Sequence, residues 1–552
     1  MPDADRPPLH FTVDGKDVEV PDDGSSLLAT LRDRLGLHSP KDGCSPQGQC
    51  GCCTVLVDGQ PRVACVTPAR RVRGRAVTTL DGLDADRRQA WGEAFCATGG
   101  SQCGFCTPGI VVRLDALAAK GADLADPAPV EQALLAHLCR CTGWRTVLDA
   151  AATMAWTASG PTGASSPARD LDAAARRATI EGRAPQRVAP DVALGRGGFA
   201  DDTAPPDALV AVPDGAGGWA VGETLDEARA AAGKVQGRRT TAELAHPLDV
   251  PPGDWVATLR TTWVEPAYLE LDASWCVPGG EPATPLANGG AFGGKRSSPA
   301  PEAARRLARD HGRPVRVVLA REDAVRLGPK RPPLAAGIRA DGTGVVRVAR
   351  TPGIAAAIAA VAPGLVVEEV DVPGPPTSAD ARAAGWAEAV ALLAAAGFTA
   401  AGAADGPGVR HVAVDDKGEA ATVSVASPDG ALATATVRQT AQPHVEVDVA
   451  CGDPLDEVVV RSYAVGASHM AMSWVTSEGL AVDAAGEVHD LTIRSFGVLR
   501  AVDTPPIEVA VEPGDGPPVN GSDAVFAAVA AATWLAQGGP PEWPTRRLPR
   551  RR

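Results

Sequence analysis

The cysteines of this chain are concentrated near its beginning. Eight of the twelve lie between Cys44 and Cys106, and two more follow soon after. They fall into two groups of four with short, regular intervals. The first group is Cys44-x5-Cys50-x2-Cys53-x11-Cys65, and the second is Cys103-x2-Cys106 with Cys139-x-Cys141. Four thiolates at one site bind either a tetrahedral Zn²⁺ or a [2Fe–2S] cluster, so the spacing predicts two metal centres.

The residues around each group favour iron–sulfur clusters. The first group lies in a glycine-rich loop, GCSPQGQCGCC, in which Gly43, Gly48 and Gly51 let backbone amides approach the cluster sulfurs closely. Its spacing is that of plant-type ferredoxins with one residue added between the first two cysteines. In the second group, Thr107-Pro108 is typical of a helix start, and a helix N-terminus favours thiolate over thiol.

Two structural zinc sites would use the same ligand types and remain an alternative, although paired zinc sites usually carry two CxxC knuckles. Cys52 is the spare cysteine of the CGCC motif. Its neighbours Cys50 and Cys53 already have the two-residue gap, so we expect Cys52 not to be a ligand.

The charge balance excludes several classes of function. The 53 Lys and Arg residues against 67 Asp and Glu give a net charge of −14, which disfavours binding to nucleic acid or to an anionic membrane. No apolar run is long enough to span a bilayer, and the first residues do not resemble a signal peptide. We therefore expect a cytoplasmic protein, in which cysteines stay reduced.

Hydrophobic periodicity divides the chain into domains. Residues 1–82 carry two hairpin patterns, 9–21 and 54–66, with a helical pattern over Ser25–Leu35 between them. Residues 83–158 carry four helical patterns, which predicts a small bundle. The helices are expected at 89–97, 108–119, 129–138 and 146–158.

Residues 159–187 are rich in Gly, Pro, Ser and charge and are interpreted as a linker. From residue 188 to 552 short β-like stretches alternate with Ala-rich helical ones, which predicts a mixed α/β body. Strands are expected at 315–319, 345–349 and 458–462, and helices at 303–308, 381–396 and 525–536.

Three stretches, LRDRLGLHSPKDGCSPQGQCGCCTVLVDG, SQCGFCTPGI and LCRCTGW, resemble the iron–sulfur part of the molybdenum hydroxylases, the xanthine dehydrogenase and aldehyde oxidoreductase family. The resemblance covers nearly all of residues 9–156. It implies an α+β architecture: a β-grasp ferredoxin domain, then a four-helix bundle, each with one [2Fe–2S] cluster. It also implies that Gln102 and Cys141 contact the pterin of a molybdopterin cofactor.

The mixed α/β body resembles the molybdenum-binding subunit of the same family in patches, including a glycine loop at Asn288–Lys295. Read alone, that loop is also typical of a tight turn. Several family features are missing. Residues 276–287 contain no glutamine, Arg296 follows the glycine loop, and no glutamate occurs between Glu512 and Glu542, where the family places its catalytic base. We therefore interpret residues 188–552 as a shortened, degenerate copy of that subunit.

These observations predict the iron–sulfur electron-transfer subunit of a molybdenum hydroxylase complex, an oxidoreductase chain with no catalytic residue of its own. Electrons would pass from molybdopterin in a partner chain, through the Cys103/Cys106/Cys139/Cys141 cluster and the Cys44/Cys50/Cys53/Cys65 cluster, towards FAD in another partner. The competing hypothesis is a self-contained molybdopterin hydroxylase of aldehydes or N-heterocycles. A zinc-binding assembly protein is the third.

Overall fold

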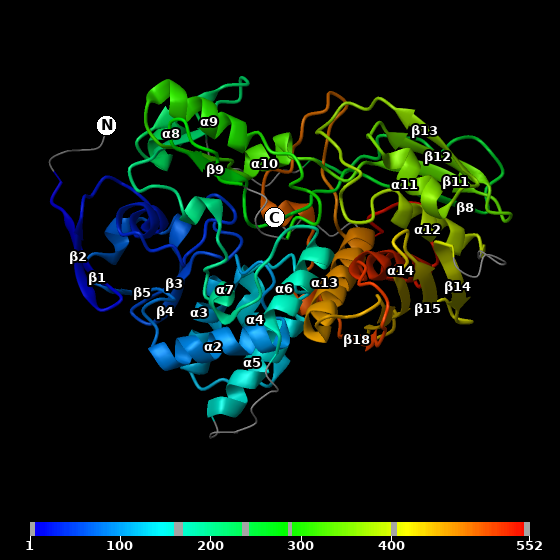
Figure 1. Ribbon diagram of the computed structural model, residues 1–552, viewed down its shortest axis with the longest axis horizontal. Coiled ribbons are helices and arrows are strands. Elements are labelled where there is room, and N and C mark those ends of the chain that lie inside the picture. Colours follow the sequence, from blue (N-terminus) through cyan, green and yellow to red (C-terminus); the bar gives the residue numbers. More distant parts are fainter. Residues whose placement is uncertain (1–5, 159–168, 235–241, 285–289, 399–405, 546–552) are drawn as a thin grey trace.

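A computed structural model describes residues 6–158, 169–234, 242–284, 290–398 and 406–545. An N-terminal sheet domain lies at one side of the molecule, a helical domain lies next to it, and the remaining chain forms a larger body that contacts both (Figure 1). The α+β architecture expected from the sequence is confirmed.

The N-terminal domain is a five-stranded mixed sheet in the order β2-β1-β5-β3-β4. Its strands are β1 Leu9–Val13, β2 Lys16–Val20, β3 Thr54–Val57, β4 Gln60–Val63 and β5 Ala76–Thr78. Both expected hairpins are present, with Asp14-Gly15 and Asp58-Gly59 at their turns. The second strand of the second hairpin is shorter than expected, because the chain turns into a 3₁₀ helix, Ala64–Val66, that carries Cys65. The expected helix is a turn of α-helix, α1 Leu27–Ala29, continued by a π-helical turn over Thr30–Arg34.

All four expected helices of the second domain are present. They are α2 Ala85–Thr98, α3 Thr107–Ala118, α4 Pro127–Ala133 and α5 Arg145–Ala158. The Asp84 side chain caps α2, and Asp126 caps α4. Pro108 occupies the first turn of α3, where its missing N–H costs no hydrogen bond.

The linker interpretation of residues 159–187 is wrong over its second half, whereas residues 159–168 lie outside the described residues. Helix α6, Leu171–Gly182, begins at the Asp170 cap and packs against the body. It buries Arg177 and Glu181, both charged, and this is why its hydrophobic pattern is weak.

The described part of the body contains three sheets, in the strand orders β7-β6-β10-β9, β13-β12-β11-β8 and β14-β15-β16-β17-β18. The strands are β6 Leu209–Pro213, β7 Trp219–Gly222, β8 Ala257–Arg260, β9 Ala273–Cys276, β10 Val315–Val318, β11 Leu334–Ile338, β12 Gly344–Ala349, β13 Leu365–Val370, β14 Gly408–Val414, β15 Ala420–Ala426, β16 Leu432–Arg438, β17 His444–Ala450 and β18 Ile507–Glu512. The remaining helices are α7 Pro190–Ala193, α8 Leu225–Ala231, α9 Ala300–His311, α10 Arg321–Leu327, α11 Ile354–Val361, α12 Trp386–Ala395, α13 Glu457–Thr476 and α14 Ser522–Leu535.

One long helix at the centre of the body contacts the helical domain. The long helix α13 packs against α14 and also contacts α2 and α5 (Figure 1). The strand expected at 458–462 is wrong, because this β-branched stretch is the first turn of α13, capped by Asp456. Val459 and Val460 pack in the interior, so tertiary burial overrides their β-propensity. The described helices include none long and apolar enough to cross a membrane.

Candidate metal centres

The first cysteine group lies where three segments of the N-terminal domain meet. Cys44 and Cys50 come from the glycine-rich loop, Cys53 directly precedes β3, and Cys65 lies in the 3₁₀ helix after β4. All four thiols are buried, with exposed fractions of at most 5%. The Cys44 thiol contacts those of Cys50 and Cys65, and the Cys65 thiol also contacts Cys53. The structure therefore brings the four expected ligands together.

Backbone amides point at these sulfurs, as the glycine-rich loop predicts. The N–H of Gln47 donates to Cys44 Sγ at 3.2 Å, and the N–H of Cys65 donates to Cys53 Sγ at 3.4 Å. Hydrogen bonds from Cys50 and Cys65 lower the pKa of the Cys44 thiol well below its usual value. Thiolate is the form that binds metal. The same contacts raise the pKa of Cys50 and Cys65 above the usual value, so among these three thiols the shift favours thiolate at Cys44 alone.

The second group lies at the N-terminus of α3 and in the loop before α5. Cys103 Sγ and Cys141 Sγ are 3.7 Å apart, and Cys106 contacts Cys139. The hydrogen bond with Cys106 lowers the pKa of Cys139 to about 6. Sulfurs gathered in two pairs suit a di-iron cluster, in which each iron takes two thiolates. No group of three or more His, Cys, Asp or Glu in the described residues is arranged to hold a single ion.

Cys52 lies between the two groups. Its thiol is fully buried beside Cys50, and its electrostatic neighbours include Cys44 and Cys53 of the first group and Cys139 of the second. A methyl group placed on Gly43 would come within 3.0 Å of Cys52 Sγ and 3.3 Å of the Phe105 ring. The two cysteine groups are thus separated by a thin, closely packed layer of side chains.

His137 occupies the same boundary between the domains. Its Nε2 lies 3.2 Å from the carbonyl oxygen of Gly109 in α3 and 3.2 Å from Thr54 Oγ1 at the start of β3. A carbonyl can only accept, so Nε2 carries the ring proton. Burial lowers the pKa of His137 to about 3, and the side chain is therefore neutral at ordinary pH.

The residues expected to contact a pterin are covered by this chain's own body. Gln102 Nε2 donates to the Cys141 carbonyl at 2.9 Å and to the backbone and hydroxyl oxygens of Ser462 in α13 at 3.2 and 3.0 Å. A methyl group on Gly466 would come within 1.8 Å of the Cys141 carbonyl. One on Gly290 would come within 3.3 Å of Cys141 Sγ. Helix α13 and the glycine loop therefore pack directly on the second group.

The room beside this group is small. A cavity of about 40 Å³ is lined by Arg140, Phe292, Trp474 and Phe526, among others. That volume holds a few water molecules at roughly 10–15 Å³ each, and not a tricyclic pterin. Gln102 Oε1 is buried without a hydrogen-bond partner, which would suit a pterin N–H, but Ser462 takes the adjoining space. The space that the described residues leave beside the second cysteine group thus does not fit a molybdopterin.

Three buried glutamates around this region were not predicted from the sequence. Glu478, at the end of α13, binds Arg140 of the cysteine loop, and Glu265 forms an ion pair with Lys330 at 2.9 Å. Glu181 of α6 accepts hydrogen bonds from the N–H groups of Gly521 and Ser522 at the start of α14. In the family, the catalytic glutamate is expected just before the helix that corresponds to α14. In this chain Glu181, which comes from another segment, binds the N-terminus of that helix. Only the three-dimensional fold brings it there.

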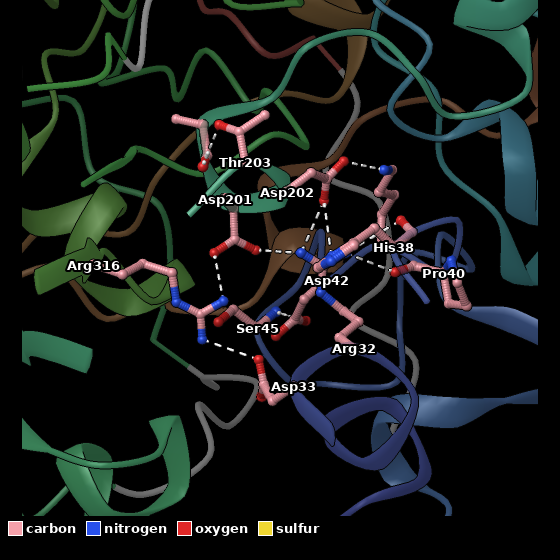
Figure 2. A network of polar contacts seen from close by, with 12 residues as sticks. Arg32, Asp33, His38, Pro40, Asp42, Ser45, Asp201, Asp202, Thr203 and Arg316 are labelled. Atoms are coloured by element: carbon pink, nitrogen blue, oxygen red, sulfur yellow. Dashed lines mark hydrogen bonds and ion pairs between the residues drawn. The ribbon is translucent and has the colours of Figure 1, made fainter. Parts of the chain in front are cut away.

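An ionic network attaches the N-terminal domain to the body (Figure 2). Arg32 Nη2 lies 2.6 Å from Asp201 and 2.9 Å from Asp202, which also binds the buried Lys41. The guanidinium of Arg316 in β10 lies 3.3 Å from the Asp201 carboxylate and 3.0 Å from that of Asp33 in the N-terminal domain, so it links the two. Burial opposes ionisation of Asp201, but the guanidinium groups of Arg316 and Arg32 outweigh it and lower its pKa.

Comparison with known families finds two matches, in the order expected from the sequence. The family described as 2Fe-2S iron-sulfur cluster binding domain matches residues 11–73, and the one described as [2Fe-2S] binding domain matches residues 79–152. The N-terminal part is 35% identical over 144 residues to a probable subunit of the xanthine dehydrogenase of Bacillus subtilis, covering 82% of that protein. It is 37% identical over 146 residues to the gamma subunit of the caffeine dehydrogenase of a Pseudomonas species, covering 87% of it. Each alignment covers 26% of this chain.

Larger relatives match over the same part. The xanthine dehydrogenase of Drosophila subobscura is 41% identical over 155 residues, and this chain spans 11% of its length. The whole chain resembles in fold the aldehyde oxidoreductase of Desulfovibrio desulfuricans, with a TM-score of 0.68 at 15% identity, covering 98% of this chain and 99% of that one. Two 2Fe-2S domains in sequence, subunit-sized relatives above 30% identity and this shared fold lead to one assignment: the chain is a member of the molybdenum hydroxylase family, which includes the xanthine dehydrogenases and aldehyde oxidoreductases.

Proposed function

We propose that this chain is the iron–sulfur electron-transfer subunit of a molybdenum hydroxylase complex. Cys44, Cys50, Cys53 and Cys65 would hold one [2Fe–2S] cluster, and Cys103, Cys106, Cys139 and Cys141 the other. The observation that carries the proposal is the gathering of eight buried thiols into two groups of four in two adjoining domains. When bound, such clusters exchange single electrons at potentials that hydrogen bonds to sulfur adjust. The amides of Gln47 and Cys65 supply such bonds at the first site.

The molybdopterin would belong to a partner chain. The small cavity beside Arg140 and the Ser462 contacts of Gln102 support this assignment. The names of the subunit-sized relatives agree with it, since each is called one subunit of a dehydrogenase. A pterin contact of Gln102 and Cys141 stays a prediction, and it would require α13 to move away from Gln102. If α13 does not move, electrons from the partner's molybdopterin would have to cross α13 and the glycine loop to reach the second cysteine group.

The alternative of a self-contained hydroxylase is favoured by one observation, the buried Gln102 Oε1 without a partner. The two proposals differ in metal content. The chain purified alone should hold about four irons, no stoichiometric zinc and no molybdenum, since each Cys₄ site takes two irons. Reduction should give two distinct paramagnetic signals. Stoichiometric molybdenum with turnover of an aldehyde would support the alternative, and about two zinc ions without visible absorption would refute both.

Co-expression tests the partner assignment. The chain should co-purify with an intact molybdenum subunit and with a flavin subunit, at iron, molybdenum and FAD contents that match the complex. A body that carries its own pterin would instead give the same molybdenum content with and without the partner.

A further inference from the structure

One widely exposed apolar side chain directly follows a cysteine of the first group. Val66, next to Cys65, is 49% exposed, and it is the one large apolar side chain among the described residues of the first two domains with such wide exposure. Its methyl groups lie about 3 Å from the Cβ position of Gly48, in the loop between Cys44 and Cys50. Val66 and this loop therefore form exposed surface directly beside Cys65, one of the four expected ligands.

Three exposed arginines lie close to Val66 along the chain. Arg62 lies at the edge strand β4, and Arg70 and Arg71 follow in the 3₁₀ helix Ala69–Val72. Four or five residues of chain reach at most about 18 Å, so these charges stay close to Val66. Within the described residues none of the three has an ion pair, whereas Arg73 and Arg75 in the same segment bind Asp22 and Asp58.

This positive surface contrasts with the net charge of −14. Electron-transfer partners form small, short-lived contacts, with an apolar centre and a charged rim that guides encounter. An exposed valine next to an expected ligand, with unpaired arginines within five residues of it, matches that design. We propose that the Val66 face, formed by Arg62, Val66, Arg70 and Arg71, docks the acidic surface of the redox protein that takes electrons from this chain. The inference rests on the proposed function and assigns it a partner chemistry.

Small oxidants of opposite charge test the face. The dithionite-reduced chain is mixed in stopped flow with ferricyanide, an anion, or with hexaamminecobalt(III), a cation, and the return of visible absorption is followed. At low ionic strength Arg70→Glu/Arg71→Glu should slow reoxidation by ferricyanide about tenfold and speed the reaction with the cobalt complex, because local charge steers encounter. At about 0.5 M salt both effects should disappear, since screening shortens the reach of charge to a few Å.

The matched control is Arg306→Glu/Arg309→Glu on α9, which makes the same change in net charge on exposed arginines of the body. It should leave both rates within twofold of the wild-type values. Equal effects of the two double variants would overturn the inference, since net charge alone would then explain them. Absence of any absorption that dithionite bleaches would refute the proposed function and the inference together.

A binding measurement gives a readout without electron transfer. A fluorescent oligoglutamate peptide should bind the full chain at low salt, and fluorescence anisotropy should show at least tenfold weaker binding to Arg70→Glu/Arg71→Glu but not to the α9 variant. If Arg70→Glu/Arg71→Glu instead lost binding to mixed phosphatidylcholine–phosphatidylserine vesicles while its affinity for the peptide stayed unchanged, the face would be a membrane site and the inference would be wrong.

Discussion

The guanidinium of Arg140 binds the carboxylate of Glu478 through two parallel hydrogen bonds of 2.5 and 2.7 Å. The two side chains are 5% and 1% exposed. Arg140 lies between Cys139 and Cys141, and Glu478 follows α13 in the body. Arg140 Nε also donates to the Pro266 carbonyl at 2.9 Å. The loop that carries two of the expected cluster ligands is thus held by the body, which gives residues 188–552 a structural role towards the clusters.

Arg140→Met should destabilise the fold by about 3–5 kcal/mol, because it leaves the Glu478 charge buried without a partner. Glu478→Gln should act in the same direction. Urea unfolding, followed by loss of visible absorption and by tryptophan fluorescence, measures the effect. In Arg140→Met/Glu478→Met no charge is left unpaired, so the double variant should be more stable than either single one. Additive losses would show that the pair acts through packing rather than charge.

The two metal centres should be lost independently. Cys50→Ser should remove one paramagnetic signal of the reduced chain and Cys106→Ser the other, since each leaves three thiolates around an iron pair. Iron content should fall from about four to about two atoms in each variant. Loss of both signals from one substitution would show that the centres depend on each other for folding.

Cys52→Ser is the matched control for the ligand assignment. Its thiol is as buried as that of Cys50 and contacts it, so the substitution disturbs the same pocket. Both signals and all of the iron should remain. If the first signal disappears instead, Cys52 is a ligand and the assignment of Cys50 or Cys53 fails.

The sequence predicted the local features well, because their causes are local. The Asp14-Gly15 and Asp58-Gly59 turns, the Asp84 cap and Pro108 define their elements within a few residues. Features that depend on distant contacts were not predicted. Helix α6 does not stand out in the sequence, because its buried charges, Arg177 and Glu181, pair with each other and are satisfied further by Val519 and Gly521, more than 300 residues away.

The same distinction holds for the candidate site. Spacing predicts the eight cysteines that the structure gathers into two groups, since a cluster imposes its intervals on the chain. That they bind clusters stays a prediction. The Arg140–Glu478 pair and the contact of Ser462 with Gln102 could not be predicted. Both contacts join the helical domain to α13 or to the residues directly after it, and the β-branched sequence Val458–Val460 at the start of α13 predicts a strand. Buried polar pairs between distant segments leave no periodic signal.

The ionic network in Figure 2 should hold the N-terminal domain on the body. Arg32→Met leaves Asp201 and Asp202 short of a cation in a largely buried setting, which should loosen the segment around Gly195, itself bound by Lys41 at 2.9 Å. Tryptic cleavage after the exposed Arg196 should become several-fold faster. Arg34→Met is the control, because its partner Asp23 lies within the N-terminal domain, and cleavage should keep the wild-type rate. Equal rates in all three proteins would show that the network is not what holds this segment.

His137 should make the junction of the two cluster domains sensitive to acid. Its pKa is about 3 in the folded chain because of burial, against an ordinary value of 6.5. Below pH 6.5 the unfolded chain therefore binds a proton that the folded chain rejects, and stability falls as pH decreases from about 6.5 towards 3. By pH 5 the loss should reach about 2 kcal/mol. Above pH 7 this residue should contribute no pH dependence.

Urea unfolding of the wild type and of His137→Gln, which keeps an N–H for the Gly109 carbonyl, measures this effect at pH 8, 6.5 and 5. The variant should lose less stability than the wild type over the acidic interval, because glutamine does not titrate there. The fall in stability with decreasing pH that remains in the variant should be due in part to His469, because burial lowers the pKa of that residue to about 4. Parallel curves for the two proteins would mean that His137 is not the group that titrates.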